Sequence, residues 1–326
     1  MPLLFIKNSI DFFLSSPGKQ KILIIYGGEP LLFFELLRKV ILYACQKSKY
    51  LKKETIISLG TNGILLKKEH LLFFNKHNVK IALSLDGNKT SHNSNRRDRK
   101  QKGSFDKIRK NFALITKNTK KQNLCVLFGI HPRNAKKMYK NFLFLLQNGF
   151  RSINIEPIQN ILWQENDVRD YKRDLKKIIF HIVRNLERKN FIFLNSMNRI
   201  LLDQKLHNSQ KKQCPFYENL EIYPSGEMSF SPFLMNSTNK DRYVIGNIKD
   251  LSLGRYLKCS YNCFKQTCIN CSVDYYPKAN KQQTFDLVRI RNYYSLKCVE
   301  LIKTQAVIRK VIYREYLQEA EKLIFE

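Results

Sequence analysis

Cysteine is the residue type with the clearest chemical potential in this sequence. Six of its eight cysteines lie beyond residue 210, and they are Cys214, Cys259, Cys263, Cys268, Cys271 and Cys298. The N-terminal stretch MPLLFIKNSIDFF lacks the layout of a signal peptide, because Lys7 and Asp11 interrupt its apolar residues. Without a secretory signal, clustered thiols favour metal ligation over disulfides. Four thiolates suit a structural Zn²⁺ ion as well as an iron–sulfur cluster, so both alternatives stay open at this point.

A second candidate site is a glycine turn in the stretch ILIIYGGEPLL, residues 22–32. Residues 22–26 are apolar without alternation, which predicts a strand buried on both faces. Gly27 and Gly28 allow a sharp turn that leaves main-chain groups bare for a small ligand. Residues 31–43 then have helical periodicity. The stretch therefore predicts a strand, a turn built for main-chain contact, and a helix.

Alternating strands and helices must position this turn. Strands are predicted at 21–26, 55–60, 80–85, 123–130 and 152–158, and helices at 31–47, 66–76, 104–117 and 134–148. This alternation indicates a parallel α/β sheet with right-handed crossovers. The predicted strands end in glycine and polar residues, and the carboxyl edge of such a sheet holds the ligand site. Cys45 and Cys125 fall in a predicted helix and strand, and we expect them to be small buried apolar residues.

Residues 161–210 are predicted to be mainly helical. Helical spacing places six residues in the core, and they are Tyr171, Leu175, Ile178, Ile179, Ile182 and Leu186. The stretch LEIYPSGEMSF predicts a hairpin whose tip is Pro224-Ser225-Gly226. A helix from about 298 to 324 is expected to close the chain.

The net charge of +31 over 326 residues is large. One interpretation is nucleic-acid binding through neutralised phosphates. The alternatives are a solvated, lysine-rich surface and an acidic or peptide partner. The densest cluster of cations, NRRDRKQKG at 95–103, is predicted to form one loop. We find no apolar run of about 18 residues or more, so no membrane span is predicted and a cytoplasmic location is expected.

Four short motifs together resemble those of radical S-adenosylmethionine (SAM) enzymes. They are YGGEPLL at 26–32, TNG at 61–63, SLDGNKTSHNSNR at 84–96 and GSFDKI at 103–108. The resemblance is closest to the branch with a C-terminal SPASM domain, which includes anaerobic sulfatase-maturing enzymes and peptide maturases. It implies a partial (β/α)6 TIM-type barrel missing its first strand, followed by a small Cys-rich SPASM domain with a β-hairpin and a helix. The implied domains are a radical SAM core at 1–160, a helical bridge at 161–210 and an iron–sulfur domain at 211–326.

The resemblance implies a SAM site at the strand ends. Gly27, Gly28, Glu29 and Pro30 would hold the methionyl amino group of SAM. Ser84 and Asp86 occupy positions where the family contacts the SAM ribose or the substrate, and Asn62 and Arg96 match family positions of less certain role. Asn62 could also be a turn residue and Arg96 a surface cation. His92 matches a family histidine, although a single loop histidine is more often structural.

The resemblance also implies iron–sulfur ligands in the last third of the chain. Cys259, Cys263, Cys268 and Cys298 would complete one auxiliary [4Fe–4S] cluster. Cys214 and Cys271 match ligands of a second cluster, which lacks the family cysteine at Ser231. We therefore expect one cluster, with the second lost or degraded.

The family's CxxxCxxC loop, whose thiolates hold the cluster that reduces SAM, has no counterpart in this sequence. Only 26 residues precede Gly27, and none of them is cysteine. The strand at 21–26 should consequently lie at a sheet edge. A fragment or misplaced start is favoured over a purposeful truncation.

The function expected from these features is radical modification of a protein or peptide side chain, with SAM, an auxiliary cluster and a redox partner. Sulfatase maturation itself is in doubt, because the family carboxylate that follows the second SPASM cysteine is replaced by Pro232 after Ser231. The alternatives are an inactive, peptide-binding relative and a zinc-containing binder of nucleic acid.

Overall fold

The computed structural model describes residues 2–158, 161–186, 188–198, 220–229, 244, 246–249, 287–300, 302, 315–316, 318–320 and 323. The chain divides into two compact units. The helix–hairpin unit joins Met1–Lys21, Glu35–Thr55 and Ser209–Lys281. The sheet unit joins Ile22–Phe34, Ile56–Asn208 and Gln282–Glu326.

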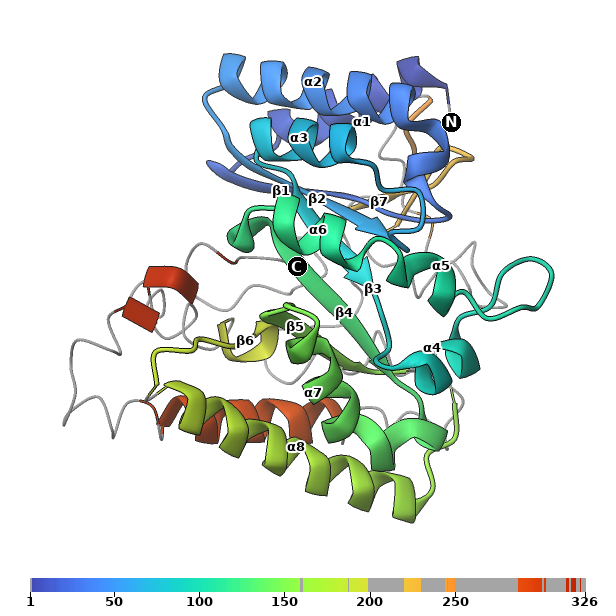
Figure 1. The fold of residues 1–326 in the computed structure, drawn as a ribbon. Helices are drawn as coiled ribbons and strands as arrows, with labels where there is room; N and C mark the ends of the chain where they lie inside the picture. Colours follow the sequence, from blue (N-terminus) through green and yellow to red (C-terminus); the bar gives the residue numbers. More distant parts are fainter. Residues whose placement is uncertain are drawn as a thin grey trace. The chain divides into compact units, whose positions relative to one another are not determined.

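A six-stranded sheet with the order β1-β2-β3-β4-β5-β6 forms the centre of the fold (Figure 1). Its strands are β1 (Gln20–Ile25), β2 (Glu54–Thr61), β3 (Lys80–Ser84), β4 (Leu124–Ile130), β5 (Ser152–Pro157) and β6 (Phe193–Leu194). The pairings from β2 to β6 are parallel. Spatial order equals chain order, as expected when each crossover returns on the same side. The α/β fold class predicted from the sequence is confirmed.

The register of these strands brings their carboxyl ends to one edge. Thr61 pairs with Leu83, and Ser84 pairs with Leu127. Gly129 pairs with Glu156 at the next interface. The loops that follow β2, β3, β4 and β5 therefore leave the sheet side by side at one edge.

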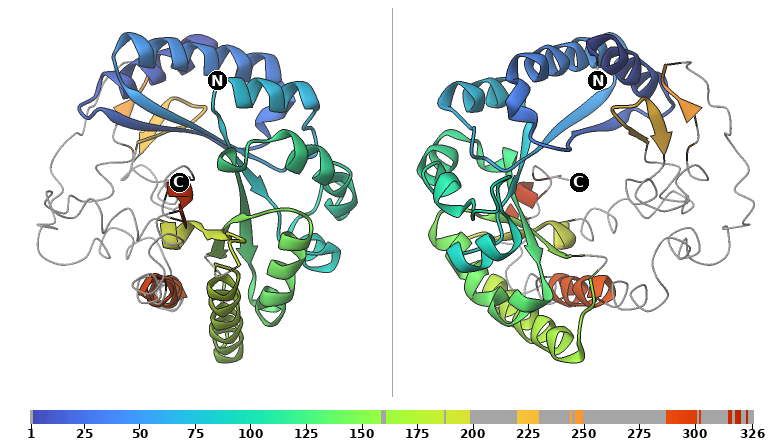
Figure 2. Two further views of the ribbon diagram at one scale, coloured as in Figure 1. Left: turned by 60° about the vertical axis from the view of Figure 1, so that its left-hand side comes forward. Right: turned by 90° about the vertical axis from the view of Figure 1, so that its right-hand side faces the viewer.

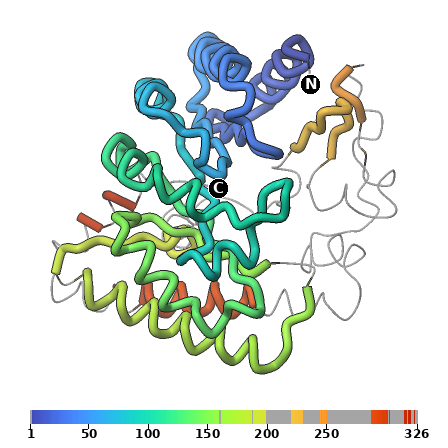
Figure 3. Tube along the Cα trace, turned by 45° about the vertical axis from the view of Figure 1, so that its right-hand side comes forward, coloured from blue at the N-terminus to red at the C-terminus, as the bar shows by residue number. Residues whose placement is uncertain are grey.

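Helices alternate with the strands along the chain. The helices are α1 (Leu3–Ser15), α2 (Phe34–Tyr50), α3 (Lys68–Lys76), α4 (Lys89–Asn95), α5 (Phe105–Arg109), α6 (Phe112–Asn118), α7 (Met138–Gln147) and α8 (Glu165–Leu186). Short 3-10 turns occur at η1 (Pro30–Phe33), η2 (Lys121–Asn123) and η3 (Pro132–Lys137). Figures 2 and 3 show α3, α6, α7 and α8 following one another along one side of the sheet.

The core of the sheet unit lies between these helices and the central strands. Ile81, Leu83 and Val126 are fully buried, as their unbroken apolar runs predict for strands covered on both faces. On α8, all six residues predicted from helical spacing are buried. β6 was not predicted, because two residues are too few to produce a periodic pattern.

One prediction for β1 is wrong. Its apolar run indicated a strand buried on both faces, yet Ile24 is 47% exposed and the following Tyr26 is 72% exposed. β1 lies at the end of the strand order, so within the described sheet it has a neighbour on one side only. The edge position itself agrees with the expectation from the sequence.

The helix–hairpin unit contains α1, α2 and a second, three-stranded sheet. Its strands are β7 (Glu221–Ile222), β8 (Glu227–Ser229) and β9 (Gly246–Asn247), paired antiparallel. The predicted hairpin tip is confirmed, because Gly226 has φ +94° and its N–H donates to the Tyr223 carbonyl. Met228 and Ile248 are fully buried and pack with Phe12 of α1.

Residues 287–300 are helical and belong to the sheet unit. This helix begins earlier than the predicted start near 298. Ser295 on this helix shares a 2.8 Å hydrogen bond with Ser196, which follows β6. The helix at 287–300 therefore contacts the segment that follows β6, within the same unit.

Candidate functional site

The turn after β1 has an open, left-handed backbone. Gly27 has φ +101° and Gly28 has φ +57°, values that residues with a side chain rarely adopt. A Cβ atom placed on either glycine would meet nothing within 4 Å. Glycine is therefore needed here for its backbone conformation and not because neighbouring atoms leave no room for a side chain.

Glu29 ties this turn to the end of β2. Its Oε1 accepts a 2.7 Å hydrogen bond from the Thr61 hydroxyl, and its Oε2 accepts a 2.8 Å bond from the Asn62 N–H. Oε1 also accepts a hydrogen bond from the Leu31 N–H. Through this bond Glu29 caps η1, whose first residue is Pro30. With three donors already bound, the carboxylate chiefly fixes the shape of the turn.

Asn62 acts within its own turn. Its Oδ1 accepts a 2.9 Å hydrogen bond from the Ile64 N–H. The next residue, Gly63, has φ +73°, and a Cβ there would lie 2.5 Å from a methyl group of buried Leu83. Of the two roles that the sequence left open for Asn62, the turn-forming role has direct hydrogen-bond support.

Asp86 lies just beyond β3 and is 2% exposed. The Arg96 guanidinium donates to both of its oxygens, through Nε and Nη2, at 3.0 Å each. Asn95 Nδ2 and the Gly129 N–H at the end of β4 donate to the same carboxylate. Four donor groups, from the end of α4 and from β4, therefore satisfy this buried charge, as burial of a carboxylate requires. Ser84 is the last residue of β3, two positions before Asp86.

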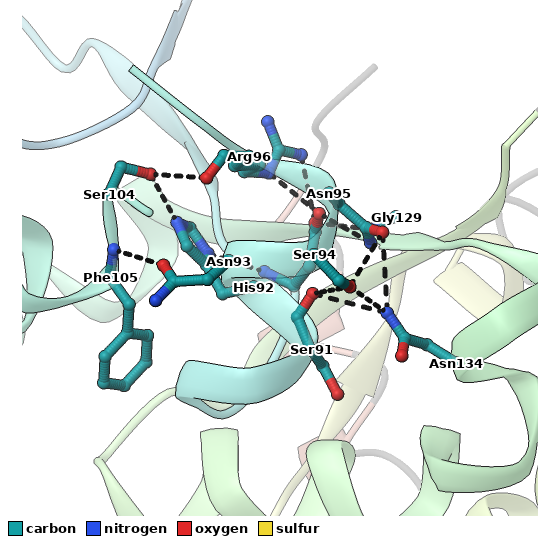
Figure 4. Close-up of polar contacts among 11 residues, drawn as sticks. Ser91, His92, Asn93, Ser94, Asn95, Arg96, Ser104, Phe105, Gly129 and Asn134 are labelled. Carbon is teal, nitrogen blue, oxygen red and sulfur yellow. Dashed lines mark hydrogen bonds and ion pairs between the residues drawn. The ribbon is translucent and has the colours of Figure 1, made fainter. Parts of the chain in front are cut away.

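His92 and Ser104 complete a ring of hydrogen bonds that also includes Asp86 and Arg96. Figure 4 shows the contacts among His92, Ser104 and Arg96. The Asp86 N–H donates to His92 Nδ1, so the ring proton sits on Nε2, 3.0 Å from the Ser104 Oγ. Ser104 Oγ donates in turn to the Arg96 carbonyl at 3.3 Å. Burial lowers the pKa of His92 to about 4, so this histidine is neutral near pH 7. Its position supports the structural role that the sequence suggested.

Sequence reasoning did not single out a further ion pair at the end of β5. Glu156 receives a hydrogen bond from Arg291 Nη1, which also donates to the Ile155 carbonyl. Arg291 comes from the helix at 287–300, more than a hundred residues away in the chain. Glu156 was visible only as the acid of the strand-end sequence IEPI, and no local pattern indicated its partner.

Among the predicted metal ligands, the described structure contains only Cys298. It is fully buried in the helix at 287–300, and burial raises the pKa of its thiol to about 12. Cys214, Cys259, Cys263, Cys268 and Cys271 lie outside the described residues, as does Ser231. Within the described part of the chain, no three His, Cys, Asp or Glu side chains are grouped closely enough to hold a metal ion.

The other two cysteines lie in the predicted helix and strand, but only Cys125 is buried as expected, because Cys45 is partly exposed. Cys45 lies on α2, and Cys125 lies on β4 and is fully buried. Burial raises the pKa of the Cys125 thiol to about 12, which makes it an inert core residue. Among the helices in the described part of the chain, none is both long enough and apolar enough to cross a membrane.

The parallel sheet and the turns at its carboxyl edge can be compared with known proteins. Residues 3–142 match the radical SAM superfamily. The chain is also similar in sequence to anaerobic sulfatase-maturating enzymes. It is 24% identical over 248 residues to the cysteine-type enzyme of Clostridium perfringens, covering 72% of this chain and 65% of that enzyme. A serine-type enzyme of Bacteroides thetaiotaomicron is 25% identical over 170 residues, or 50% of this chain and 39% of that enzyme.

Solved structures support the same fold. A structure of anSMEcpe with bound AdoMet and the Cp18Cys peptide superposes with a TM-score of 0.70 at 18% identity, covering 94% of this chain and 92% of that chain. In the sequence comparison, by contrast, the matched segment spans just under two thirds of the Clostridium perfringens enzyme. The resemblance to radical SAM enzymes drawn from the four motifs is confirmed.

Proposed function

We propose that this chain is a radical SAM protein that acts on a side chain of a peptide or protein. The observation that carries the proposal is the open turn at Gly27 and Gly28, which Glu29 fastens to the end of β2 within a radical SAM domain. Homology to sulfatase-maturating enzymes supports a modifying activity. A bound cysteine peptide in a structure of anSMEcpe supports a peptide as the substrate class.

We propose that SAM binds beside the glycine turn, where a Cβ on Gly27 or Gly28 would meet no protein atom within 4 Å. In the proposed site, main-chain groups of Gly27 and Gly28 hold the methionyl ammonium, because Glu29 is already bound by three protein donors. Ser84 and Arg96 are proposed contacts for the ribose or carboxylate. Asp86 serves this site through Arg96, whose guanidinium it holds at the end of β3.

SAM bound to a reduced [4Fe–4S] cluster supplies a carbon radical that removes a hydrogen atom from the substrate. The CxxxCxxC thiolates for that cluster are not among the 326 residues. We propose that Cys259, Cys263, Cys268 and Cys298 hold an auxiliary [4Fe–4S] cluster, while Cys214 and Cys271 belong to an incomplete second set. The domain limits 1–160, 161–210 and 211–326 remain part of this proposal, as do the redox partner and the cytoplasmic location.

Purification without oxygen, followed by iron, sulfide and zinc analysis, tests the auxiliary cluster. We expect a brown protein with about four iron and four sulfide per chain. Cys263→Ser and Cys268→Ser should lose this iron, whereas Cys45→Ser, in α2, should retain it. A colourless protein with stoichiometric zinc would instead establish the zinc alternative and overturn the iron–sulfur assignment.

A second candidate is a non-catalytic peptide-binding protein with the same fold. Reduction with dithionite in the presence of SAM separates the two candidates when a CxxxCxxC segment is supplied together with these 326 residues, because that segment holds the cluster that reduces SAM. Formation of 5′-deoxyadenosine supports the enzyme, and peptide binding without SAM cleavage supports the binding protein.

A further inference from the structure

The loop between α4 and α5 carries an unusual density of unpaired positive charge. Residues 97–102, here called the basic loop, contain four cations and one acid. In Figure 1 this teal segment projects outward from the helices on either side of it. Arg97, Arg99, Lys100 and Lys102 are all exposed. None of these four side chains pairs with an acidic group within the described residues.

The basic loop has a defined conformation. Arg97 and Gly103 form an antiparallel bridge, and the Asp98 N–H donates to the Lys102 carbonyl at 2.8 Å. Asp98 Oδ1 accepts from the N–H groups of Lys100 and Lys102 at 2.9 Å each. The loop therefore presents its cations on an ordered turn, so that less conformational entropy is lost when a partner binds.

The only acid of the loop is used internally. Asp98 Oδ2 accepts a 2.8 Å hydrogen bond from Lys107 Nζ on α5. Asp98 thus neutralises Lys107 and leaves the charges of the four loop cations uncompensated. Such a cluster attracts an acidic partner by charge complementarity and selects against a basic one.

The basic loop is anchored at the candidate site. It follows Arg96, whose guanidinium is bonded to Asp86 at the end of β3. It is followed by Ser104, which donates to the Arg96 carbonyl and meets His92. A peptide whose reacting residue lies at the carboxyl edge of the sheet would therefore extend past this loop.

We infer that the basic loop binds an acidic segment of the peptide substrate, adjacent to the residue that is modified. The inference relies on the proposed function for the peptide nature of the partner. The loop contains no aromatic side chain on which an unpaired base could stack, so its composition favours an acidic peptide over single-stranded nucleic acid.

Fluorescence anisotropy with two labelled peptides tests this inference on the full chain. One peptide is neutral with a central cysteine, and the other carries an added block of glutamates at one end. At low salt we expect the acidic peptide to bind at least about tenfold more tightly, equivalent to about 1.4 kcal/mol. The preference should weaken as salt screens the exposed charges.

Two variants that lose the same number of positive charges test whether the preference for the acidic peptide comes from the basic loop. The loop variant combines Arg97→Gln, Arg99→Gln, Lys100→Gln and Lys102→Gln. The control combines Lys39→Gln, Lys68→Gln, Lys117→Gln and Lys172→Gln at exposed helix positions, and it removes the same charge. We expect the loop variant to lose the acidic preference and the control to retain it. Thermal unfolding confirms that each variant is folded, and Arg97→Lys with Arg99→Lys should preserve binding.

Equal weakening by the loop and control variants would overturn the inference, because binding would then follow net charge alone. It would also be overturned if the acidic peptide bound the parent no better than the neutral one. Single-stranded RNA that bound more tightly and lost more affinity in the loop variant would assign the loop to nucleic acid. Since none of these measurements requires SAM cleavage, their failure is distinguishable from failure of the proposed enzymatic function.

Discussion

Two carboxylates, Glu29 and Asp86, join neighbouring strand ends at the carboxyl edge of the sheet. Glu29 connects the turn after β1 with Thr61 and Asn62, and Asp86 connects Arg96 with Gly129 at the end of β4. Each accepts hydrogen bonds from groups that are distant in sequence. At the scale of single residues, the shape of the candidate site therefore depends chiefly on two carboxylates whose oxygens already accept hydrogen bonds from the protein.

Asp86→Ala is expected to lower the free energy of unfolding by about 3 kcal/mol, because it leaves the Arg96 guanidinium and a strand-end N–H without their acceptor. Urea unfolding followed by circular dichroism measures the change. Asp106→Ala provides the control, because that carboxylate is 62% exposed and its ion-pair partner among the described residues is exposed Lys89. The control should change stability by less than about 0.5 kcal/mol. Equal effects would show that burial of Asp86 carries no stability.

His92 makes a pH-dependent contribution. The unfolded state gains a proton below pH 6.5, whereas burial keeps the folded side chain neutral down to about 4. Stability should therefore be retained above pH 6.5 and lost as the pH falls toward 4, by up to about 3 kcal/mol. In urea unfolding at several pH values, His92→Gln should have a shallower acid-side slope than the parent. Unchanged slopes would contradict the buried, neutral state of His92.

At the scale of elements, the glycine turn and the edge strand depend on each other. β1 has one neighbouring strand in the described sheet, and Glu29 adds side-chain bonds between its turn and β2. An edge strand makes fewer main-chain contacts than a central one, so such cross-links matter more for its position. The glycine turn is therefore formed by residues close together in the chain, but hydrogen bonds to the end of β2 help to hold it in place.

Glu29→Ala should lower the free energy of unfolding by about 2 kcal/mol, because three hydrogen-bond donors lose their acceptor. Urea unfolding measures this loss, and hydrogen exchange of the Leu31 and Asn62 amides should accelerate. Glu35→Ala is a suitable control, since the Glu35 side chain is 71% exposed and, within the described part of the chain, pairs with Arg38. A loss in Glu29→Ala no larger than in this control would show that the turn holds its shape unaided.

At the scale of the whole molecule, charge repulsion opposes folding. The sequence has 58 Lys and Arg against 27 Asp and Glu, so 31 positive charges are not neutralised by acidic side chains. Like-charge repulsion across the surface destabilises the compact state, and salt screens it over about 10 Å at 0.1 M.

The thermal midpoint should therefore rise as sodium chloride increases from about 20 to about 300 mM, in contrast to a protein stabilised mainly by surface ion pairs. Differential scanning calorimetry measures the change. Potassium chloride should act equally, because the effect depends on ionic strength. A midpoint that falls with salt would mean that the paired charges outweigh the excess cations.

The sequence by itself determined the α/β class, most helices and strands, and the position of the glycine turn. These follow from periodicity and from backbone conformations that only glycine adopts easily, and both are local properties. The six predicted core residues of α8 are buried for the same reason. Recognition of the radical SAM motifs likewise required only residues close together in the chain.

Tertiary structure alone decided which partners the site residues have. Glu29 bonds to residues more than thirty positions away, and Glu156 bonds to Arg291 across more than a hundred. No periodicity records such contacts, because they depend on how crossovers bring separate strand ends to one edge. The exposure of Ile24 was misjudged for the same reason, since an apolar run does not reveal whether its strand lies at the centre or the edge of the sheet.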